Sequence, residues 1–182
     1  TEHVLAALVG LEIDNILIEI NAEEPPIMDG SSKFFVDALE KAGLKELSSL
    51  RNEYIVKDII SFNDPKSGSE ITLIPSENYQ ITTMVDYETK VLGTQNATLT
   101  KLSEFKDEFS NARTFSFLHE IEMLLEDNLI KGGDLNNAIV YVDKKISENT
   151  MEKLKKAFNK DKVSVKSNGI LDNLNLHYQN EA

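Results

Sequence analysis

The chain has 182 residues, with 19 Lys and Arg against 31 Asp and Glu, which gives a formal net charge of −12. This acidity argues against non-specific nucleic-acid binding and against docking on an anionic membrane surface, because both need clustered positive charge. The absence of cysteine excludes disulfides, thiolate metal ligands and a cysteine nucleophile. The length is sufficient for one large domain or two small ones, each with a buried core.

No apolar run reaches the roughly 18 to 20 residues that a membrane-spanning helix needs, so we expect no integral membrane segment. The sequence opens on Thr-Glu-His without Met or a basic leader, and it stops at Asn-Glu-Ala. We therefore interpret the chain as a fragment of a longer protein.

The first part of the chain predicts the order helix, strand, loop, helix. Residues 1–10 favour a short helix between an N-cap threonine and a terminal glycine. Residues 13–20 alternate as in a strand, and residues 21–31 contain two prolines and an Asp-Gly pair typical of a loop. Residues 32–43 predict an amphipathic helix that begins at a serine and ends at a glycine. A lone strand leaves its edges unpaired, so we expect its partners to come from outside this segment.

The character of the sequence changes near residue 50. Residues 54–60, 70–74 and 79–85 predict three strands, and their short connections favour an antiparallel meander. Further elements are expected in the rest of the chain: helices at 102–109, 117–128 and 151–158, and a buried strand at 138–142. The segment 171–178 fits neither pattern clearly. Together these elements indicate an α+β fold, with helices packed on mainly antiparallel sheets in two units divided near residue 48.

Three histidines are present, and His119 and His177 have the sequence context of ordinary surface or structural residues. His3 differs because it lies in the first turn of a helix beside Glu2. The positive end of the helix dipole favours a neutral, metal-competent imidazole and an ionised carboxylate. A carboxylate next to a metal-bound water can act as a general base. An acidic first turn is also ordinary helix capping, and that alternative remains open.

A second candidate is the segment Arg113-Thr114-Phe115-Ser116-Phe117, where hydroxyl residues precede a predicted helix. One interpretation is a plain N-cap, which the downstream Glu120 would fit. The other is a hydroxyl group that stabilises an oxyanion beside an apolar wall. The Gly132-Gly133 pair matches no phosphate-binding fingerprint and predicts a chain reversal.

Several blocks of the sequence together resemble a known family. The blocks are Glu-His-Val-Leu-Ala-Ala-Leu at 2–8, Pro-Ile-Met-Asp-Gly-Ser at 26–31, Ala-Arg-Thr-Phe at 112–115 and Gly-Gly at 132–133. In order and spacing they resemble the zinc-dependent UDP-3-O-acyl-N-acetylglucosamine deacetylases of lipid A synthesis, along nearly the whole chain. The resemblance implies two similar two-layer α/β sandwich domains. Residues 1–48 would be the C-terminal half of the first, incomplete domain, and residues 49–182 most of the second.

The resemblance also implies an activity, a cofactor and site residues. The reaction would be the hydrolysis of the N-acetyl group of a UDP-linked acylated glucosamine, releasing acetate, in the cytoplasm of a Gram-negative bacterium. His3 would be a ligand of Zn2+, Glu2 the general base, and Thr114 the hydroxyl that holds the oxyanion. Asp86 and Tyr87 would lie at the nucleotide end. The passage for the acyl chain would be lined by Phe115, Phe117, Leu118, Ile121, Gly133, Ala138 and Val140.

The sequence departs from the family in one decisive respect. The other zinc ligands of the family come from a His-Lys-x-x-Asp helix, and no such motif is present in these 182 residues. Ser116 also stands where the family commonly has glycine, and Asp134 where serine or a similar residue is common. We therefore expect the fragment alone to be inactive, to bind little zinc and to self-associate through unpaired strand edges. A non-catalytic structural or interaction domain is the alternative, and a fusion with a second lipid-synthesis enzyme is left open.

Overall fold

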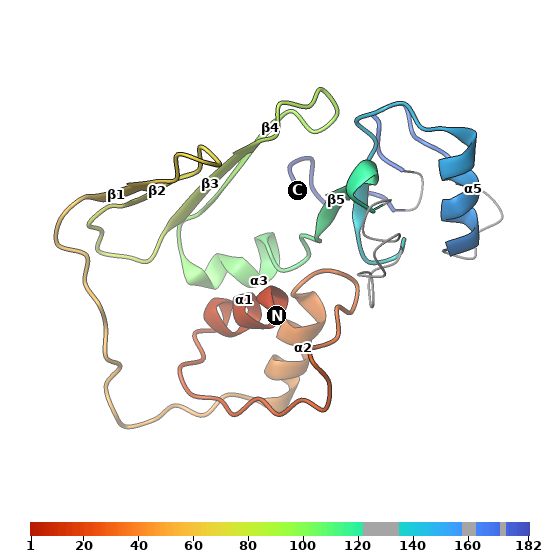
Figure 1. Ribbon diagram of the computed structural model, residues 1–182. Coiled ribbons are helices and arrows are strands. Elements are labelled where there is room, and N and C mark those ends of the chain that lie inside the picture. Colours follow the sequence, from red (N-terminus) through yellow and green to blue (C-terminus); the bar gives the residue numbers. More distant parts are fainter. Residues whose placement is uncertain (122–134, 158–162, 172–173) are drawn as a thin grey trace.

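The computed structural model describes residues 1–121, 135–157, 163–171 and 174–182 (Figure 1). Helices and small two-stranded sheets alternate along these residues, which confirms the α+β class. In chain order the elements are α1 (Glu2–Gly10), α2 (Lys33–Ala42), β1 (Ile60–Asn63), β2 (Glu70–Leu73), β3 (Ile81–Asp86), β4 (Thr94–Leu99), η1 (Leu102–Glu104), α3 (Phe105–Glu108), β5 (Phe115–Phe117), β6 (Ile139–Tyr141) and α5 (Glu148–Ala157).

The N-terminal helices α1 and α2 form where the sequence predicts them, and both pack near α3 (Figure 1). Gly10 allows the closest approach, because a Cβ atom there would lie 2.0 Å from Cδ1 of Phe105. A salt bridge of 2.8 Å between Lys106 Nζ and Glu40 Oε2 joins α3 to α2. The packing of the Phe105 ring against Gly10 and the Lys106–Glu40 ion pair thus join α3 to the two N-terminal helices.

The predicted strand at residues 13–20 is wrong. These residues form an irregular, largely exposed segment between α1 and α2 (Figure 1). Within the described residues, no strand pairs with this segment. An alternating apolar pattern becomes a β-strand only when a neighbouring strand accepts and donates its backbone hydrogen bonds. Arg51 instead ties the start of the segment to the chain near residue 50 through a 2.8 Å ion pair between its Nε and Oδ1 of Asp14.

The middle of the chain forms two antiparallel hairpins rather than one three-stranded meander. In the first hairpin β1 pairs with β2, and Ile60 lies opposite Leu73. In the second hairpin β3 pairs with β4, and Ile81 lies opposite Leu99. The predicted meander is wrong because the partner of β3 is β4, a polar strand that the apolar patterning does not reveal. The predicted strand at 54–60 overlaps β1 only at its last residue.

The third sheet pairs β5 with β6 in parallel, with Phe115 opposite Ile139. The helix predicted from Phe117 begins one residue later: Phe117 ends β5, residues 118–121 are helical, and the remainder lies outside the described residues. The predicted strand at 138–142 and the predicted helices at 102–109 and 151–158 are confirmed as β6, η1 with α3, and α5.

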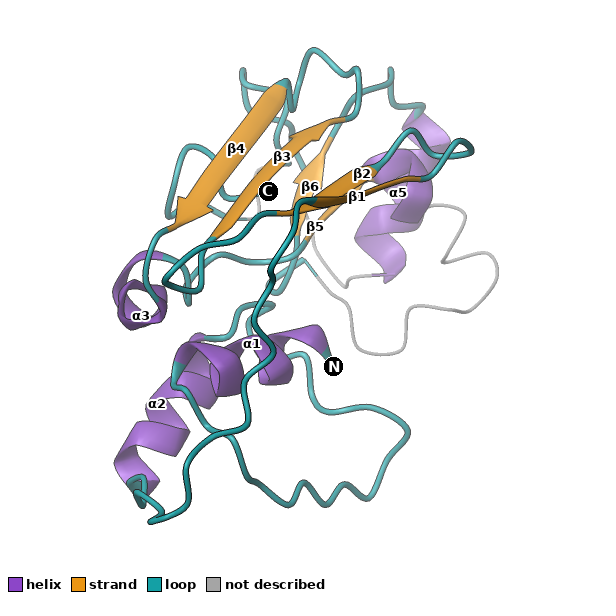
Figure 2. Cartoon of the chain, turned by 90° about the vertical axis from the view of Figure 1, so that its left-hand side faces the viewer, coloured by secondary structure: helices purple, strands orange, loops and turns teal. Residues whose placement is uncertain are grey.

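The β5–β6 sheet lies between the β3–β4 hairpin and α5 (Figure 2), and an apolar cluster packs on each side. The cluster that contains Leu154 of α5 comprises Leu118, Ile121, Leu135, Val140, Leu154, Val163 and Leu171. The other cluster comprises Leu92, Phe117, Ile139, Tyr141 and Ile170. Alternate residues of β6 thus contribute to opposite clusters, as the two faces of a strand require.

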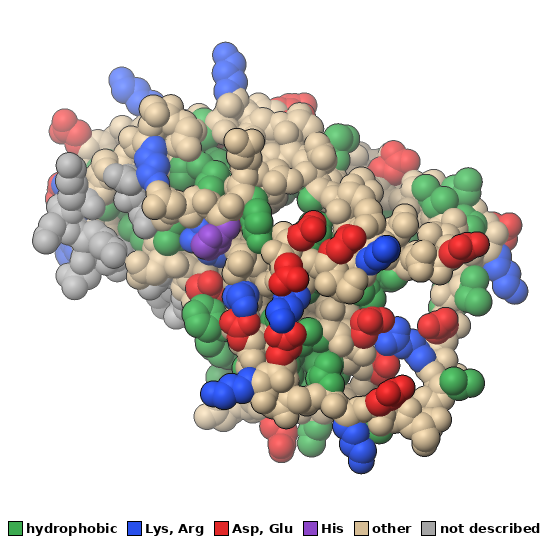
Figure 3. All heavy atoms as spheres, turned by 180° about the vertical axis from the view of Figure 1, so that it is seen from behind, with side chains coloured by type: hydrophobic (Ala, Val, Ile, Leu, Met, Phe, Trp, Pro, Cys, Tyr) green, Lys and Arg blue, Asp and Glu red, His purple; other side chains and the backbone are tan. Residues whose placement is uncertain are grey.

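Positive and negative side chains are interspersed on the face shown in Figure 3, where hydrophobic groups also stand exposed toward the end formed by β1 and β2. Across the described part of the chain, no helix is both long and apolar enough to cross a membrane.

Candidate active site

The N-terminal turn of α1 borders a cleft of about 230 Å³. Its lining consists of Thr1, Glu2, His3, Val4, Glu24, Pro25, Pro26, Ile27 and Phe35. The predicted general base Glu2 and the predicted metal ligand His3 therefore lie at the same cleft, opposite the loop with two prolines. Glu24 contributes a further carboxylate. Its sequence signal was only an acidic pair inside a loop, too common to indicate a site.

The Glu2 carboxylate lies in surroundings that favour its ionised form. Its pKa is below the usual range chiefly because its own backbone N–H donates a hydrogen bond to it, and His3 adds a smaller favourable interaction. Partial burial opposes these effects without reversing them. An ionised carboxylate is the form that can accept a proton from water.

The described residues do not fit a complete zinc site. Among them, no cluster of three or more His, Asp or Glu side chains could hold a metal ion. His3 supplies one imidazole, whereas a catalytic zinc ion takes three protein ligands.

Thr114 is held by backbone hydrogen bonds on both sides of its Cα atom. Its N–H donates to the carbonyl oxygen of Gly30 at 2.7 Å, and its carbonyl oxygen accepts from Ile139 N–H at 2.9 Å. Thr114 is not among the residues that line the cleft. The loop that lines the cleft at Ile27 continues to Gly30, whose carbonyl oxygen accepts the hydrogen bond from Thr114. The structure thus connects the two predicted catalytic regions through one short loop.

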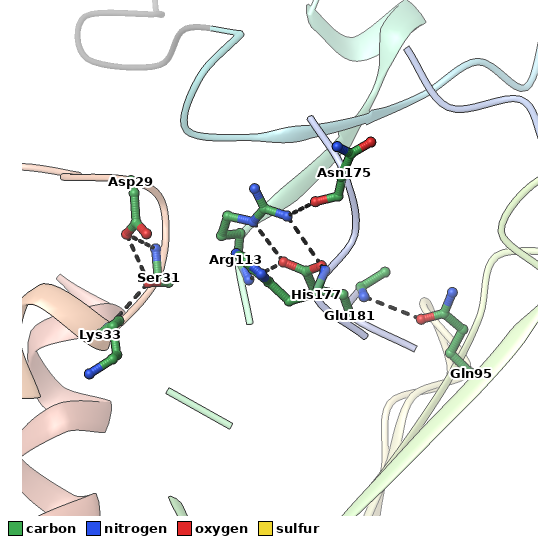
Figure 4. A network of polar contacts seen from close by, with 9 residues as sticks. Asp29, Ser31, Lys33, Gln95, Arg113, Asn175, His177 and Glu181 are labelled. Carbon is green, nitrogen blue, oxygen red and sulfur yellow. Dashed lines mark hydrogen bonds and ion pairs between the residues drawn. The ribbon is translucent and has the colours of Figure 1, made fainter. Parts of the chain in front are cut away.

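That loop has a defined internal structure (Figure 4). Oδ1 of Asp29 accepts hydrogen bonds from the N–H and the hydroxyl group of Ser31, at 3.1 and 2.8 Å. The Ser31 hydroxyl oxygen accepts in turn from Lys33 N–H at 3.1 Å, next to the start of α2. Gly30 has φ of +84°, and a Cβ atom there would lie 1.8 Å from the carbonyl oxygen of Asn137. The Asp-Gly-Ser block is therefore a tight turn seated against the turn that precedes β6.

Asp86 and Tyr87, predicted at the nucleotide end, lie at the end of β3. Asp86 accepts hydrogen bonds from the Thr94 hydroxyl at 2.7 Å and from Glu88 N–H at 2.8 Å, and these bonds lower its pKa. The Tyr87 ring contacts the rings of Phe115 and Phe117 edge-on, at centroid distances of 5.7 and 5.6 Å. Residues assigned to the nucleotide and to the acyl chain thus share one aromatic cluster.

The residues predicted to line the acyl passage fall on both sides of the β5–β6 sheet. Phe115 and Phe117 pack in the cluster with Tyr141, whereas Leu118, Ile121 and Val140 belong to the cluster against α5. Ala138 is half-buried just before β6. Gly133 lies outside the described residues.

His119 has more structural partners than its sequence context predicts. Its Nδ1 lies 2.9 Å from Oδ1 of Asp143, and its ring stacks on Phe117 at 5.7 Å. Asp143 is 24 residues away in sequence, so no local pattern could reveal the pair. His177 contributes its backbone N–H to Glu181, and its ring meets Tyr178 edge-on.

The predicted Ser or Thr N-cap is not formed as expected: the Glu120 carboxylate, and not the Ser116 hydroxyl oxygen, accepts from the backbone at the start of this helix. Glu120 Oε2 accepts from Phe117 N–H at 3.1 Å and lies 3.3 Å from the Ser116 hydroxyl. These contacts satisfy a donor at the start of the helical residues 118–121.

Comparison with known proteins identifies the family. A family model described as "LpxC: UDP-3-O-acyl N-acetylglycosamine deacetylase" matches residues 1–181. The chain is 43% identical over 189 aligned positions to a "Bifunctional enzyme LpxC/FabZ" of Chlorobaculum tepidum, covering 100% of this chain and 39% of that relative. It is 41% identical to a protein of the same name from Bacteroides thetaiotaomicron, covering 99% of this chain and 39% of that relative.

A third relative carries a single activity in its name. The chain is 39% identical over 142 positions to the "UDP-3-O-acyl-N-acetylglucosamine deacetylase" of Idiomarina loihiensis, covering 76% of this chain and 46% of that relative. The chain therefore spans less than half the length of these curated relatives. With a family model matched from its first residue to its penultimate one, the chain belongs to the LpxC family of UDP-3-O-acyl N-acetylglycosamine deacetylases.

Proposed function

We propose that the full-length gene product containing these residues hydrolyses the N-acetyl group of a UDP-linked acylated glucosamine in lipid A synthesis. The observation that carries the proposal is the cleft at the start of α1, where Glu2 and His3 lie together in a chain of this family. The names of the relatives support the substrate class.

In the proposed reaction a water molecule attacks the acetyl carbonyl carbon, the C–N bond breaks, and the products are acetate and a free amine. Glu2, whose lowered pKa keeps the carboxylate ionised, accepts the proton of the attacking water. The Thr114 hydroxyl donates to the oxyanion of the tetrahedral intermediate. Glu2 passes its proton to the departing nitrogen, so that the atoms and charges balance.

Zinc dependence is part of the proposal for the full-length protein. His3 would be one ligand, and the remaining ligands must come from outside the described residues, since these supply no complete donor set. By the same reasoning, we propose that the 182 residues alone do not turn over substrate and bind little zinc.

Substrate binding would involve the aromatic cluster around Tyr87. An exposed aromatic ring can stack on a nucleobase, and Asp86 lies beside it. The apolar side chains of β5, β6 and the helical residues 118–121 would contact the acyl chain. In this proposal residues 1–48 and 49–182 belong to two similar two-layer α/β domains, and the enzyme acts in the cytoplasm of a Gram-negative bacterium.

The test is Glu2→Ala in the full-length gene product. We expect acetate release from the UDP-linked substrate to fall by about 100-fold or more, as for loss of a general base. Zinc content, measured by atomic emission, should stay near that of the wild type. Loss of zinc would make Glu2 a ligand or a scaffold residue instead. A wild-type protein that releases no acetate would overturn the proposed function and favour a non-catalytic domain.

A further inference from the structure

The segment next to Thr114 is tied to the last residues of the chain by a buried ion pair (Figure 4). Nε of Arg113 lies 2.7 Å from Oε1 of Glu181, and Nη2 lies 3.3 Å from Oε2. The two side chains are 6% and 0% exposed. This is the two-pronged geometry in which guanidinium and carboxylate groups bind most specifically.

Each oxygen of the Glu181 carboxylate also accepts a hydrogen bond from a backbone N–H group. Oε1 accepts from Arg113 N–H at 3.2 Å, and Oε2 accepts from His177 N–H at 2.6 Å. Nη2 of Arg113 donates in addition to the carbonyl oxygen of Asn175 at 2.6 Å. A buried charge without such partners is strongly unfavourable, so loss of either residue would leave the other charge buried and unpaired.

The backbone of Arg113 and Thr114 is consequently fixed by three different parts of the chain. Arg113 N–H is held by Glu181, Thr114 N–H by Gly30, and the Thr114 carbonyl by Ile139. The residues around Glu181 are themselves anchored on β4. Asn180 Nδ2 donates to the carbonyl oxygen of Asn96 at 2.6 Å, and Ala182 N–H donates to Oε1 of Gln95 at 3.2 Å.

We propose that Arg113 and Glu181 are positioning residues that fix the Thr114 hydroxyl for the reaction. This rests on the proposed function, which gives Thr114 its role toward the oxyanion. Neither charged group faces substrate, because the carboxylate is fully buried and the guanidinium nearly so. They act through the backbone: Glu181 holds the peptide N–H that precedes Thr114. An oxyanion donor stabilises the transition state only at a correct position, so a small displacement of this backbone lowers turnover.

The first experiment measures the backbone directly and does not depend on activity. Hydrogen exchange is followed by mass spectrometry in the full-length gene product, for peptides that cover residues 112–118. Glu181→Gln keeps the shape of the side chain but turns one acceptor oxygen into a donor. We expect exchange in these peptides to be at least about tenfold faster than in the wild type, while peptides from β3 and β4 change little. Unchanged exchange in 112–118 would overturn the proposal.

The control is Glu104→Gln. Glu104 also accepts several hydrogen bonds, from the Thr100 hydroxyl and from Thr100 and Lys101 N–H, but it lies near the surface before α3. The Glu104→Gln substitution should leave hydrogen exchange in residues 112–118 as in the wild type. If Glu181→Gln fails to fold, Arg113→Lys replaces it, because lysine keeps the charge and loses the two-pronged contact.

The second experiment is a double-mutant cycle on kcat. Glu181→Gln alone should lower kcat about tenfold and change KM less than twofold. In a Thr114→Val background it should have almost no further effect, because the group that it positions is already gone. Equal fold losses in both backgrounds would indicate a general structural role and overturn the proposal. A wild type without acetate release would instead refute the proposed function, and the exchange result would still decide whether the pair fixes this backbone.

Discussion

The ring of Tyr87 meets the ring of Phe117 edge-on, with centroids 5.6 Å apart and ring planes at 74°. Tyr87 follows β3 and Phe117 ends β5, so this contact joins two separate sheets. Tyr87 remains 51% exposed. The same ring therefore contacts the buried Phe117 ring and leaves part of its surface exposed for a ligand.

Replacing Tyr87 should show whether its exposed ring surface contributes to nucleotide binding. Tyr87→Ala should weaken the binding of uridine diphosphate to the full-length protein about tenfold, from the loss of one stacking surface. Tyr87→Phe should bind nearly as the wild type does. Isothermal titration calorimetry measures both. Tyr79→Ala, which removes a ring of equal exposure before β3, is the control. Equal binding by the wild type and Tyr87→Ala would remove Tyr87 from the nucleotide site.

Gly30→Ala should destabilise the fold more than an ordinary glycine substitution. The new Cβ atom would meet a backbone carbonyl at 1.8 Å in a left-handed conformation, so the expected loss is about 2 kcal/mol or more. Gly68→Ala is the matched control, since Gly68 has φ of +72° with open space around it. Urea denaturation followed by circular dichroism compares the two. A loss no greater than that of Gly68→Ala would contradict the tight seating of the turn against Asn137.

Thr114→Val should remove the proposed oxyanion donor with little change in shape. We expect kcat of the full-length protein to fall about 100-fold or more, with zinc content and melting temperature near those of the wild type. Thr98→Val, on the exposed face of β4, should leave kcat unchanged. Wild-type turnover by Thr114→Val would show that the hydroxyl group has no part in the reaction.

The buried Tyr141 ring should make the fold sensitive to alkaline pH. Burial raises the pKa of its hydroxyl group above the ordinary value of about 10, and the nearby Gln95 offsets this only in part. Above pH 10 the unfolded chain therefore loses this proton before the folded chain does, and stability falls as pH rises. Below pH 10 the contribution is complete. Tyr141→Phe should show a smaller decrease in melting temperature between pH 9 and 11 than the wild type, measured by scanning calorimetry.

Tyr141→Phe should also be tolerated at neutral pH. Within the described residues the Tyr141 hydroxyl group is buried, and its polar neighbour Gln95 forms no hydrogen bond of good geometry with it; such a poorly satisfied group costs about 1 to 3 kcal/mol. We expect a melting temperature equal to or above that of the wild type. A clear loss of stability would show that the hydroxyl group has a partner that matters.

The β1–β2 hairpin should mediate self-association of the 182-residue chain. Phe62 and Ile71 lie directly opposite each other and are 65% and 63% exposed. The pair Phe62→Glu and Ile71→Lys should lower the mass measured by light scattering toward that of one chain, since it replaces apolar surface by facing opposite charges. Leu50→Lys, outside the hairpin, is the control. A wild-type mass of one chain at all concentrations would contradict the prediction.

Local patterns in the sequence were sufficient to predict the elements whose backbone hydrogen bonds are internal. Helices α1, α2 and α5 follow from local patterns because their backbone bonds are internal, although the predicted caps Thr1 and Ser32 make no side-chain cap bond. The strands required information that is not local. Residues 13–20 carry a strand pattern without a described partner, and β4 pairs with β3 although Thr, Gln and Asn dominate its sequence.

The candidate site likewise contains neighbours that the sequence could predict and pairs that it could not. Adjacent residues such as Glu2 and His3 could be placed together from sequence, because the first turn of a helix fixes them. The His119–Asp143 and Arg113–Glu181 pairs span 24 and 68 residues, and the chain path that closes such distances cannot be read from spacing. The resemblance to the family supplied roles for Thr114 and Tyr87, while the structure supplied their neighbours.

The contact between Gly10 and the Phe105 ring has a consequence for evolution and for design. Any larger residue at position 10 would have to displace the Phe105 ring or move the first helix, and a moved helix would carry with it the imidazole two turns upstream. The location of His3 thus depends on a residue whose contribution is a missing side chain. Mutant libraries designed to vary the cleft should therefore keep glycine at position 10.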